Sequence, residues 1–230
     1  MNTLIALEGI DGAGKGTQTA KLVQRLQSLG LKVASLQFPR YSETTFGGAI
    51  GDFLNGKFGS LDQVHPQLAA VLYAGDRFES KDILQQAQQE HDVVVLDRFT
   101  GSNLAHQCAK LDGEARSNLQ SWIDQVEHKV FGLPRPDRTV LIDISSQWSR
   151  TLVSRKGDRD YTDEEADIHE SNLPYLERVR RCYLDIAAAT DSWHVVPSLK
   201  DDGQLRSIDE IHELIFACVQ QLLPTGCRQD

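Results

Sequence analysis

Short apolar runs alternate along this chain with longer segments in which apolar positions recur with the period of a helix. The runs at residues 3–7, 32–37, 92–96, 138–142 and 194–196 are rich in Val, Ile and Leu, which is typical of strands buried on both faces. After the first run, a three- and four-residue step joins Thr19, Leu22, Val23, Leu26 and Leu29, and Gly30 follows where a left-handed helix cap is needed. This alternation predicts a parallel α/β sheet with helices between its strands.

Helical periodicity continues through the rest of the chain, at residues 63–90, 103–130, 146–154, 172–189 and 207–223. The prolines of the segment 133–137 favour a rigid lead into the fourth strand. The chain contains no internal repeat, no low-complexity tract and no segment with the composition of a linker. We therefore expect a single domain over residues 1–230.

The composition fits one globular domain and argues against two kinds of partner. Of the 230 residues, 40% are hydrophobic, which is enough to bury one sizeable core. The 33 acidic residues outnumber the 24 basic residues, and the resulting net charge of −9 disfavours a nucleic-acid polymer or a membrane surface. A phosphate-binding site in this chain must therefore rely on a local cluster of basic side chains.

The chain shows no sign of a membrane or secretory segment. No apolar run approaches the roughly 18 residues of a membrane span, and no basic region precedes the first glycines. The four cysteines are scattered, without the spacing of a zinc site or a disulfide framework, so we expect buried reduced thiols. These features predict a cytoplasmic protein.

The sharpest motif lies between the first predicted strand and the first predicted helix. Glycines at this junction let backbone N–H groups point inward as a phosphate-binding nest, and a lysine can reach the terminal phosphates of a nucleotide. Gly16 stands where a magnesium-binding Ser or Thr is usual, so that Thr17 is expected to act through water or on a phosphate. The ATP-binding candidates are Gly9, Asp11, Gly12, Ala13, Gly14, Lys15, Gly16 and Thr17.

A second pair of candidates, Asp97 and Arg98, follows the third predicted strand. Ligands of open parallel sheets bind outside the carboxyl ends of the strands, where an acidic residue can hold magnesium and an arginine can clamp a phosphate. A solvated Asp-Arg turn is the structural alternative. The phosphate-binding motif favours the functional interpretation.

Two weaker patterns concern aromatic and charged residues. Phe38, Pro39 and Tyr41 follow the second predicted strand and offer flat faces for a base or a sugar, although aromatics beside a strand more often belong to a core. Tyr73 and Arg77 lie in a helical run, where a surface ion pair is an alternative to a binding role.

Residues 150–159 concentrate three arginines and one lysine in an acidic chain. A charged, glycine-containing stretch between helices is typical of a lid that orders over substrate, and an arginine closing on a transferring phosphoryl group contributes about 10³ to 10⁵ in rate. The alternative is a solvated helix end with dispersed charges.

The ordered set of motifs GIDGAGKGTQ, FPRY, YAGDR and DRFTGSNLAHQ, followed by the basic segment and DIHE, resembles the thymidylate kinases among the nucleoside monophosphate kinases. The resemblance covers residues 3–197. It implies a P-loop nucleoside-monophosphate-kinase fold with a five-stranded parallel sheet flanked by helices, and a mobile lid at about residues 153–166. It also implies transfer of the γ-phosphoryl group of ATP to dTMP, a requirement for Mg²⁺, and a homodimer.

The resemblance also implies roles for individual residues. Lys15 and Arg98 would be catalytic, together with Arg155 and Arg159 of the lid. The residues implied to bind dTMP are Asp11, Phe38, Pro39, Tyr41, Tyr73, Arg77, Arg98, Asn103, His106, Asp167 and His169. Those implied to lie near the metal are Asp11, Asp97 and Glu170.

Three positions depart from the family pattern. Gly12 replaces a catalytic arginine of one branch, so the transition-state charge is expected to be met by the lid arginines. His106 stands where a tyrosine crowds the sugar 2′ position, which leaves discrimination against ribonucleotides open. His169 replaces a frequent tyrosine, and the two histidines are expected to make activity sensitive to pH between about 5 and 8.

Two other functions are compatible with the phosphate-binding motif. A kinase for another nucleotide or nucleoside would keep this motif and change the pocket around Phe38, Arg77, Asn103 and His106. A regulatory module would bind ATP without transferring its phosphate. The basic segment argues against such a module, because simple binding needs no arginines over the γ-phosphate.

Overall fold

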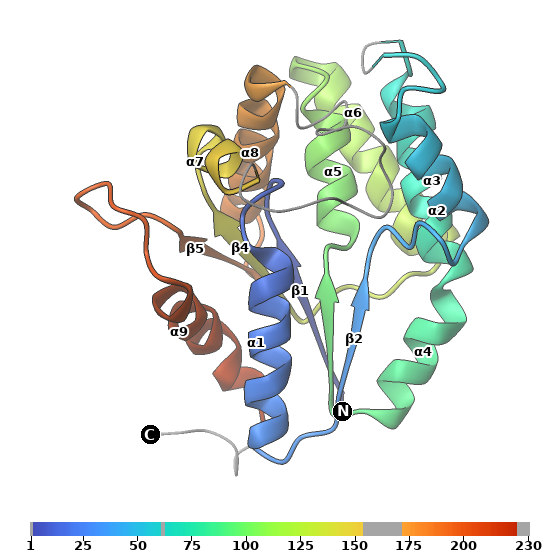
Figure 1. Ribbon diagram of the computed structural model, residues 1–230. Coiled ribbons are helices and arrows are strands. Elements are labelled where there is room, and N and C mark those ends of the chain that lie inside the picture. Colours follow the sequence, from blue (N-terminus) through green and yellow to red (C-terminus); the bar gives the residue numbers. More distant parts are fainter. Residues whose placement is uncertain (1, 61–62, 154–171, 225–230) are drawn as a thin grey trace.

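The computed structural model describes residues 2–60, 63–153 and 172–224 (Figure 1). Five parallel strands form one sheet in the order β2-β3-β1-β4-β5. Their bounds are β1 Thr3–Glu8, β2 Val33–Gln37, β3 Val93–Asp97, β4 Arg138–Asp143 and β5 Trp193–Pro197. The predicted five-stranded parallel α/β sheet is therefore confirmed.

The strands all end at the same edge of the sheet, where the candidate residues lie. Leu7 of β1 is paired with Asp97 of β3, and the backbone N–H of Arg98 donates to the carbonyl of Leu7 over 3.0 Å. The segment after β1 and the segment after β3 consequently lie side by side. Asp97 is the last residue of its strand and is 9% exposed.

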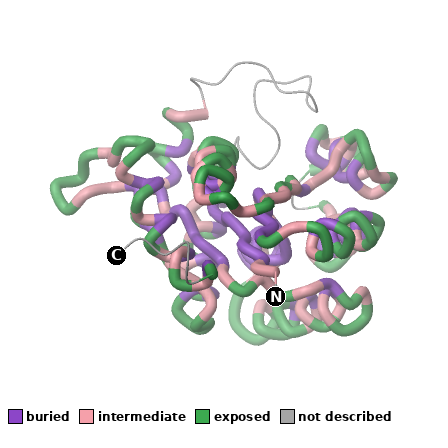
Figure 2. Tube along the Cα trace, turned by 90° about the horizontal axis from the view of Figure 1, so that it is seen from below, coloured by how far each residue is buried: buried purple, intermediate pink, exposed green. Residues whose placement is uncertain are grey.

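Helices cover both faces of the sheet (Figures 1 and 2). Helices α1 and α9 contact each other and pack on one face, whereas α4, α5 and α8 lie on the other. The buried residues follow the central strands in Figure 2. The α-helices are α1 Lys15–Ser28, α2 Thr45–Leu54, α3 Pro66–Glu79, α4 Lys81–Glu90, α5 Thr100–Cys108, α6 Gly113–Asp124, α7 Ser146–Val153, α8 Leu173–Ala188 and α9 Ile208–Val219, with a π-helix at Gln125–Val130 and a 3₁₀ turn at Gln220–Leu222.

The prediction that segments 63–90 and 103–130 each form one continuous helix was wrong. The segment 63–90 forms α3 and α4, separated at Ser80, whose hydroxyl donates to the backbone carbonyl of Asp76 over 2.8 Å. The segment 103–130 is interrupted before α6, where Asp112 is extended and Gly113 has φ +56°. Its last turn is the π-helix, not α-helix.

Helix α2 was missed because three glycines hide its periodicity. At Gly47, a Cβ atom would stand 2.0 Å from the backbone carbonyl of Arg40, so the helix needs glycine for this close approach. Thr44 caps the helix by accepting from the N–H of Gly47 over 2.8 Å. Tertiary contact thus outweighs local helix propensity here.

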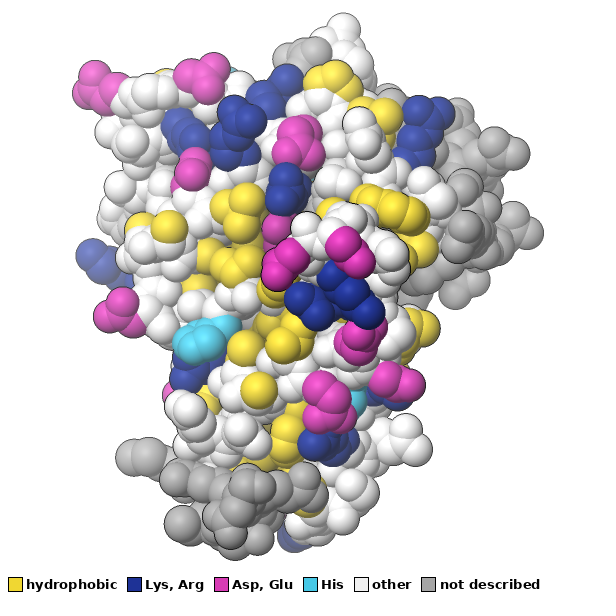
Figure 3. All heavy atoms as spheres, turned by 90° about the vertical axis from the view of Figure 1, so that its left-hand side faces the viewer, with side chains coloured by type: hydrophobic (Ala, Val, Ile, Leu, Met, Phe, Trp, Pro, Cys, Tyr) yellow, Lys and Arg dark blue, Asp and Glu magenta, His cyan; other side chains and the backbone are white. Residues whose placement is uncertain are grey.

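The surface carries charges of both signs, and the expectation of buried thiols is confirmed for two of the four cysteines. On the face that carries α7, β5 and α9, basic and acidic side chains are interspersed (Figure 3), with ion pairs such as Lys21–Asp209 and Arg25–Glu213. Cys108 and Cys182 are buried free thiols, as predicted, whereas the free thiol of Cys218 is only half-buried and Cys227 lies outside the described residues. Within the described ranges, no helix has the length and apolarity needed to cross a membrane.

Candidate functional site

The loop between β1 and α1 has the backbone of a phosphate-binding nest. Gly9, Gly12 and Gly14 have φ values of +148°, +76° and +87°, which glycine adopts without strain. Gly14 precedes the first helical turn of α1, in which Gly16 and Thr17 are exposed. The loop therefore presents N–H groups, a helix N-terminus and a free hydroxyl at one edge of the sheet.

Lys15 lies folded over this loop. Its ammonium is buried and donates to the carbonyls of Gly9 and Ile10 over 3.0 and 2.9 Å. Burial lowers the pKa of Lys15 to about 8, and the neighbouring Arg98 acts in the same direction, while nearby carboxylates, first that of Asp11, oppose it. The lysine is mostly charged at pH 7 and can exchange its two carbonyl partners for phosphate oxygens.

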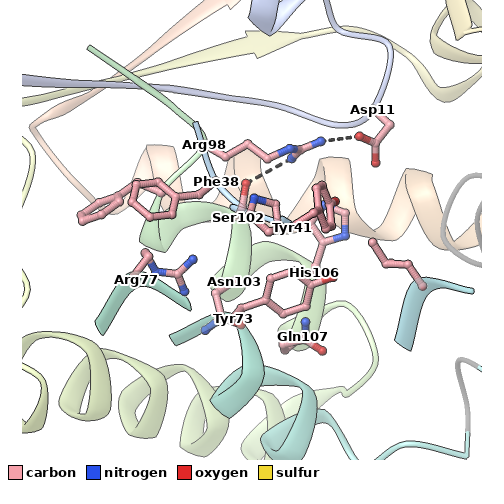
Figure 4. Close-up of a pocket in the computed structure, with 13 residues that line it drawn as sticks. Asp11, Phe38, Tyr41, Tyr73, Arg77, Arg98, Ser102, Asn103, His106 and Gln107 are labelled. Carbon is pink, nitrogen blue, oxygen red and sulfur yellow. Dashed lines mark hydrogen bonds and ion pairs between the residues drawn. The ribbon is translucent and has the colours of Figure 1, made fainter. Parts of the chain in front are cut away.

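Arg98 lies directly opposite the loop, in an unusual backbone conformation. Its φ of +66° makes it the single non-glycine residue in the left-handed region within the described chain. The guanidinium donates to the carbonyl of Gly9 and the hydroxyl of Ser102, both over 3.1 Å, and forms an ion pair with Asp11 (Figure 4). Burial would lower the pKa of Arg98, but the surrounding carboxylates, first that of Asp11, raise it well above its usual value.

The buried carboxylate of Glu8 stabilises the segment that carries Arg98, and Glu8 was not predicted as a site residue. One carboxylate oxygen accepts from the N–H groups of Phe99 and Ser102 over 2.9 and 3.0 Å. The other accepts from the hydroxyls of Ser102 and Tyr183 over 2.6 and 3.1 Å. Burial raises the pKa of Glu8, although these hydrogen bonds and Arg98 oppose the shift. An acidic residue at the end of a buried strand was the available signal.

A cavity that is partly open to solvent lies beside the Arg98–Asp11 pair, with an empty space of about 480 Å³ when the open part is included. Figure 4 shows side chains from the loop after β1, the segment after β2, α3 and α5 converging on it. Of the residues predicted to bind the acceptor, the lining includes Asp11, Phe38, Pro39, Tyr41, Tyr73, Arg77, Arg98, Asn103 and His106. Four lining residues were not predicted: Leu54, Phe99, Ser102 and Gln107.

The aromatic residues form the walls of this cavity. Phe38 is buried, with its ring 5.7 Å from that of Phe99 at an angle of 54°. His106 lies 3.3 Å from the Tyr175 hydroxyl through its Nδ1 atom, and the same hydroxyl donates to the carbonyl of His106 over 2.9 Å. These contacts fix the position of the histidine in the wall.

The carboxylate of Asp76 stabilises the segment after β2, which carries the aromatic wall of the cavity. Its carboxylate accepts from the hydroxyl of Thr44 over 2.6 Å and from the N–H of Arg40 over 3.1 Å. Burial raises the pKa of Asp76, and these two hydrogen bonds act against the rise. The residue thus joins α3 to the segment after β2.

Charged and amide side chains lie at the base of the cavity. Arg77 is 2% exposed and pairs with the buried carboxylate of Glu127, which excludes the alternative of a surface ion pair. Asn103 donates to the same carboxylate over 2.8 Å. Gln107 is 0% exposed, and its amide nitrogen and oxygen have no hydrogen-bond partner among the described residues. Its spacing of four from Asn103 along α5 was a signal that could have found it.

The metal candidates are only partly described. Asp97 lies beside the first turn of α1, where its Oδ2 is 3.3 Å from the position of a Cβ on Gly16. Asp11 lies on the neighbouring loop, whereas Glu170 is outside the described residues. The described part of the chain contains no group of three or more His, Cys, Asp or Glu residues that could hold a metal ion.

Helix α7, which follows β4, packs against the phosphate-binding loop and ends at Val153, where the predicted lid begins. The hydroxyl of Ser149 donates to the carbonyl of Asp11, and the carbonyl of Ser149 would be 2.6 Å from a Cβ on Gly12. No side chain fits at position 12 without displacing this helix. The predicted residues Arg155, Arg159, Asp167, His169 and Glu170 lie outside the described residues.

Comparison with known proteins gives a consistent result. Residues 7–215 match the family model described as thymidylate kinase. The chain is similar to thymidylate kinase from Mycobacterium tuberculosis, with 33% identity over 205 residues covering 88% of this chain and 94% of that one. It is 34% identical over 200 residues to thymidylate kinase from Synechococcus, covering 85% and 88%. The fold resembles the solved thymidylate kinase of Candida albicans, with a TM-score of 0.73, 24% identity and coverage of 96% and 92%.

Proposed function

The chain belongs to the thymidylate kinase family and phosphorylates dTMP with ATP as donor, and we propose how its residues carry out this transfer. The observation that carries the proposal is the meeting of two features at one sheet edge. The phosphate-binding loop with Lys15 adjoins the Arg98–Asp11 pair, and the same pair lines the cavity. ATP then binds over the loop, and dTMP fills the cavity with its phosphate toward the loop.

The donor site uses the loop after β1. The ATP phosphates accept hydrogen bonds from the N–H groups of residues 12–17, and the ammonium of Lys15 compensates their charge. The exposed hydroxyl of Thr17 acts on a phosphate or through water. This arrangement is supported by the positive φ values of the loop glycines, which turn the backbone toward a ligand.

The acceptor site uses the cavity. Arg98 and Tyr41 hold the phosphate of dTMP, Asp11 accepts from the sugar 3′-hydroxyl, and His106 lies against the sugar. Phe38, Pro39 and Tyr73 provide apolar walls for thymine, while Arg77 and Asn103 bind its polar edge. We add Gln107 to this set, because its buried amide lines the cavity without a partner among the described residues.

Mg²⁺ fits the carboxylates at this edge. In phosphoryl-transfer sites the ion is held by one or two carboxylates together with substrate phosphates, so a full protein cage is not required. Asp11 and Asp97 would supply these oxygens, with Glu170 as a third candidate. When bound, the ion neutralises charge on the phosphates of the donor.

Transfer itself needs little covalent chemistry from the protein. The phosphate oxygen of dTMP is already ionised near neutral pH, so no general base is required, and catalysis consists of positioning and charge stabilisation. Lys15 and Arg98 stabilise charge on the transferring group from two sides. Arg155 and Arg159, in a lid at about residues 153–166, supply the remaining positive charge and exclude water.

The lid assignment has its own test. Arg155→Ala and Arg159→Ala are expected to lower kcat far more than they weaken dTMP binding, whereas Lys15→Ala loses most of kcat with the fold intact. The matched control is Arg150→Ala, in the described helix α7 just before this segment. Full activity in both lid variants would contradict the assignment.

The proposed acceptor is tested by an assay of ADP release with ATP and a panel of nucleoside monophosphates. The fastest turnover is expected with dTMP, and ribonucleotides in the panel report the effect of His106. A different preferred acceptor would support a related kinase, and tight ATP binding without turnover would support a regulatory module. Omission of Mg²⁺ should abolish turnover.

We also propose a homodimer in the cytoplasm. Exposed apolar side chains, Leu68 of α3 at 65% and Phe58 at 48%, support association of two copies. The free thiols of Cys108, Cys182 and Cys218 support a reducing compartment. Sedimentation equilibrium and cell fractionation test these two statements.

A further inference from the structure

A fully buried carboxylate, that of Glu127, lies beneath the cavity where three elements meet. Glu127 belongs to the π-helix, and its side chain is 1% exposed. One oxygen accepts from Nε of Arg77 over 2.9 Å, and the other accepts from Nη2 of Arg77 and from Nδ2 of Asn103. Short π-helical segments frequently occur at functional sites. Glu127 thereby binds to both side chains that face the polar edge of the base.

We propose that Glu127 is a positioning residue that makes the acceptor site select a thymine-type base over cytosine. The proposal rests on the proposed function of the cavity as the dTMP site. Glu127 does not touch the base in this account. It acts by fixing which hydrogen-bonding atoms of Asn103 and Arg77 face the ligand.

The amide of Asn103 has one allowed orientation in this network. Its two N–H groups donate to the carbonyl of Ala70 over 3.0 Å and to the Glu127 carboxylate over 2.8 Å. The reversed amide would place Oδ1 against these two acceptors and is therefore excluded. The fixed orientation leaves Oδ1 buried, without a partner among the described residues, in a side chain that lines the cavity. Asn103 thus offers the ligand an acceptor.

Arg77 offers donors beside this acceptor. A guanidinium has five N–H groups, and the Glu127 carboxylate uses one on Nε and one on Nη2. This bidentate contact fixes the plane of the guanidinium, which also lies 6.0 Å from the centre of the Phe99 ring. Its remaining N–H groups are available to the cavity that Arg77 lines.

The resulting pattern matches one class of pyrimidine. Thymine and uracil carry a ring N–H next to the 4-carbonyl, so the N–H donates to Asn103 and the carbonyl accepts from Arg77. Cytosine has the reverse pattern, with an acceptor at N3 and an amino group at C4. Its N3 acceptor would face Oδ1 of Asn103, and its amino group would face the N–H groups of Arg77. Both contacts would leave buried polar groups unpaired.

The test is Glu127→Gln, with kcat/KM measured for dTMP and dCMP. The new amide has one oxygen, whereas the carboxylate uses both of its oxygens to accept from Nε and Nη2 of Arg77 and from Nδ2 of Asn103. In either orientation the amide nitrogen would therefore meet at least one of these donors. We expect the ratio of kcat/KM for dTMP to that for dCMP to fall by about tenfold or more. A purely structural role would lower both values together and leave the ratio unchanged.

The matched control is Glu8→Gln, which alters another fully buried carboxylate, whose hydrogen-bond partners among the described residues are Phe99, Ser102 and Tyr183. Its ratio is expected to stay at the wild-type value even if activity falls. A further readout is Asn103→Ala, alone and combined with Glu127→Gln. Because Glu127 acts partly through Asn103, the double variant should lose less selectivity than the two single losses combined.

The outcomes separate the inference from the proposed function. Wild-type protein that does not phosphorylate dTMP would refute the proposed function. Active wild-type protein together with an unchanged ratio in Glu127→Gln would overturn the inference. If circular dichroism shows that Glu127→Gln is unfolded, Glu127→Asp keeps the buried charge but shortens its reach, and an unchanged ratio in that variant overturns the inference.

Discussion

Lys15 allows a quantitative prediction, because its ammonium is buried in the folded chain and solvated in the unfolded one. Burial lowers its pKa from 10.5 to about 8, with Arg98 acting in the same direction and carboxylates opposing it. A difference of this size corresponds to about 3 kcal/mol of linked stability. The charged form is the one penalised in the folded state. The contribution is therefore fully present above about pH 10.5 and is lost as the pH falls through about 8.

The assay is urea denaturation of wild-type protein and of Lys15→Met at pH 7 and at pH 10.5. The difference in free energy of unfolding between the two proteins should shift by about 3 kcal/mol in favour of the wild type at the higher pH. Other titrating groups cancel in this comparison. The matched control is Lys21→Met on the same helix, where the side chain is 34% exposed in an ion pair with Asp209. A wild-type and Lys15→Met pair that respond identically to pH would refute the reasoning.

Three further predictions concern buried groups around the site. Glu8→Ala leaves buried donors unpaired beneath Arg98 and should lower the free energy of unfolding by about 3–5 kcal/mol, measured by urea denaturation; a loss below about 1 kcal/mol contradicts this. Gly12→Ala should cost more stability and activity than Gly14→Ala, because both have positive φ but only position 12 meets a backbone carbonyl, at 2.6 Å; equal losses would refute the steric argument. Burial raises the thiol pKa values of Cys108 and Cys182 to about 12 and about 11, so neither should react with a disulfide reagent in native protein at pH 8, as mass spectrometry would detect.

The strands could be predicted from the sequence because a parallel sheet covered on both faces requires continuous apolar runs. The loop around Lys15 could be predicted because its glycines are adjacent in sequence and its function depends on local backbone geometry. Helix α2 could not be predicted, because its glycines lower the helix propensity of the segment. Gly47 is needed for close contact with the backbone carbonyl of Arg40, and the sequence does not reveal this contact. Local patterns therefore predict the parts of the fold that depend on local physics.

Some residues of the site could likewise be predicted from the sequence, whereas their buried partners could not. Arg77 could be identified as a candidate, but its partner Glu127 lies 50 residues further along the chain, where nothing in the local pattern indicates pairing. Glu8 could be recognised as an acidic residue at the end of an apolar strand, but its partners Ser102 and Tyr183 lie far along the chain. Buried ion pairs between distant segments depend on packing and need a three-dimensional structure to be recognised.

The left-handed backbone of Arg98 has a consequence for the evolution of this protein. At this position the backbone favours glycine, because a side chain at φ +66° carries strain of about 1–3 kcal/mol. The chemistry requires a guanidinium at the same place, facing Asp11. Selection for thermal stability alone and selection for catalysis therefore pull this residue in opposite directions. Directed evolution of more stable variants would have to retain activity as a criterion at every round to keep Arg98.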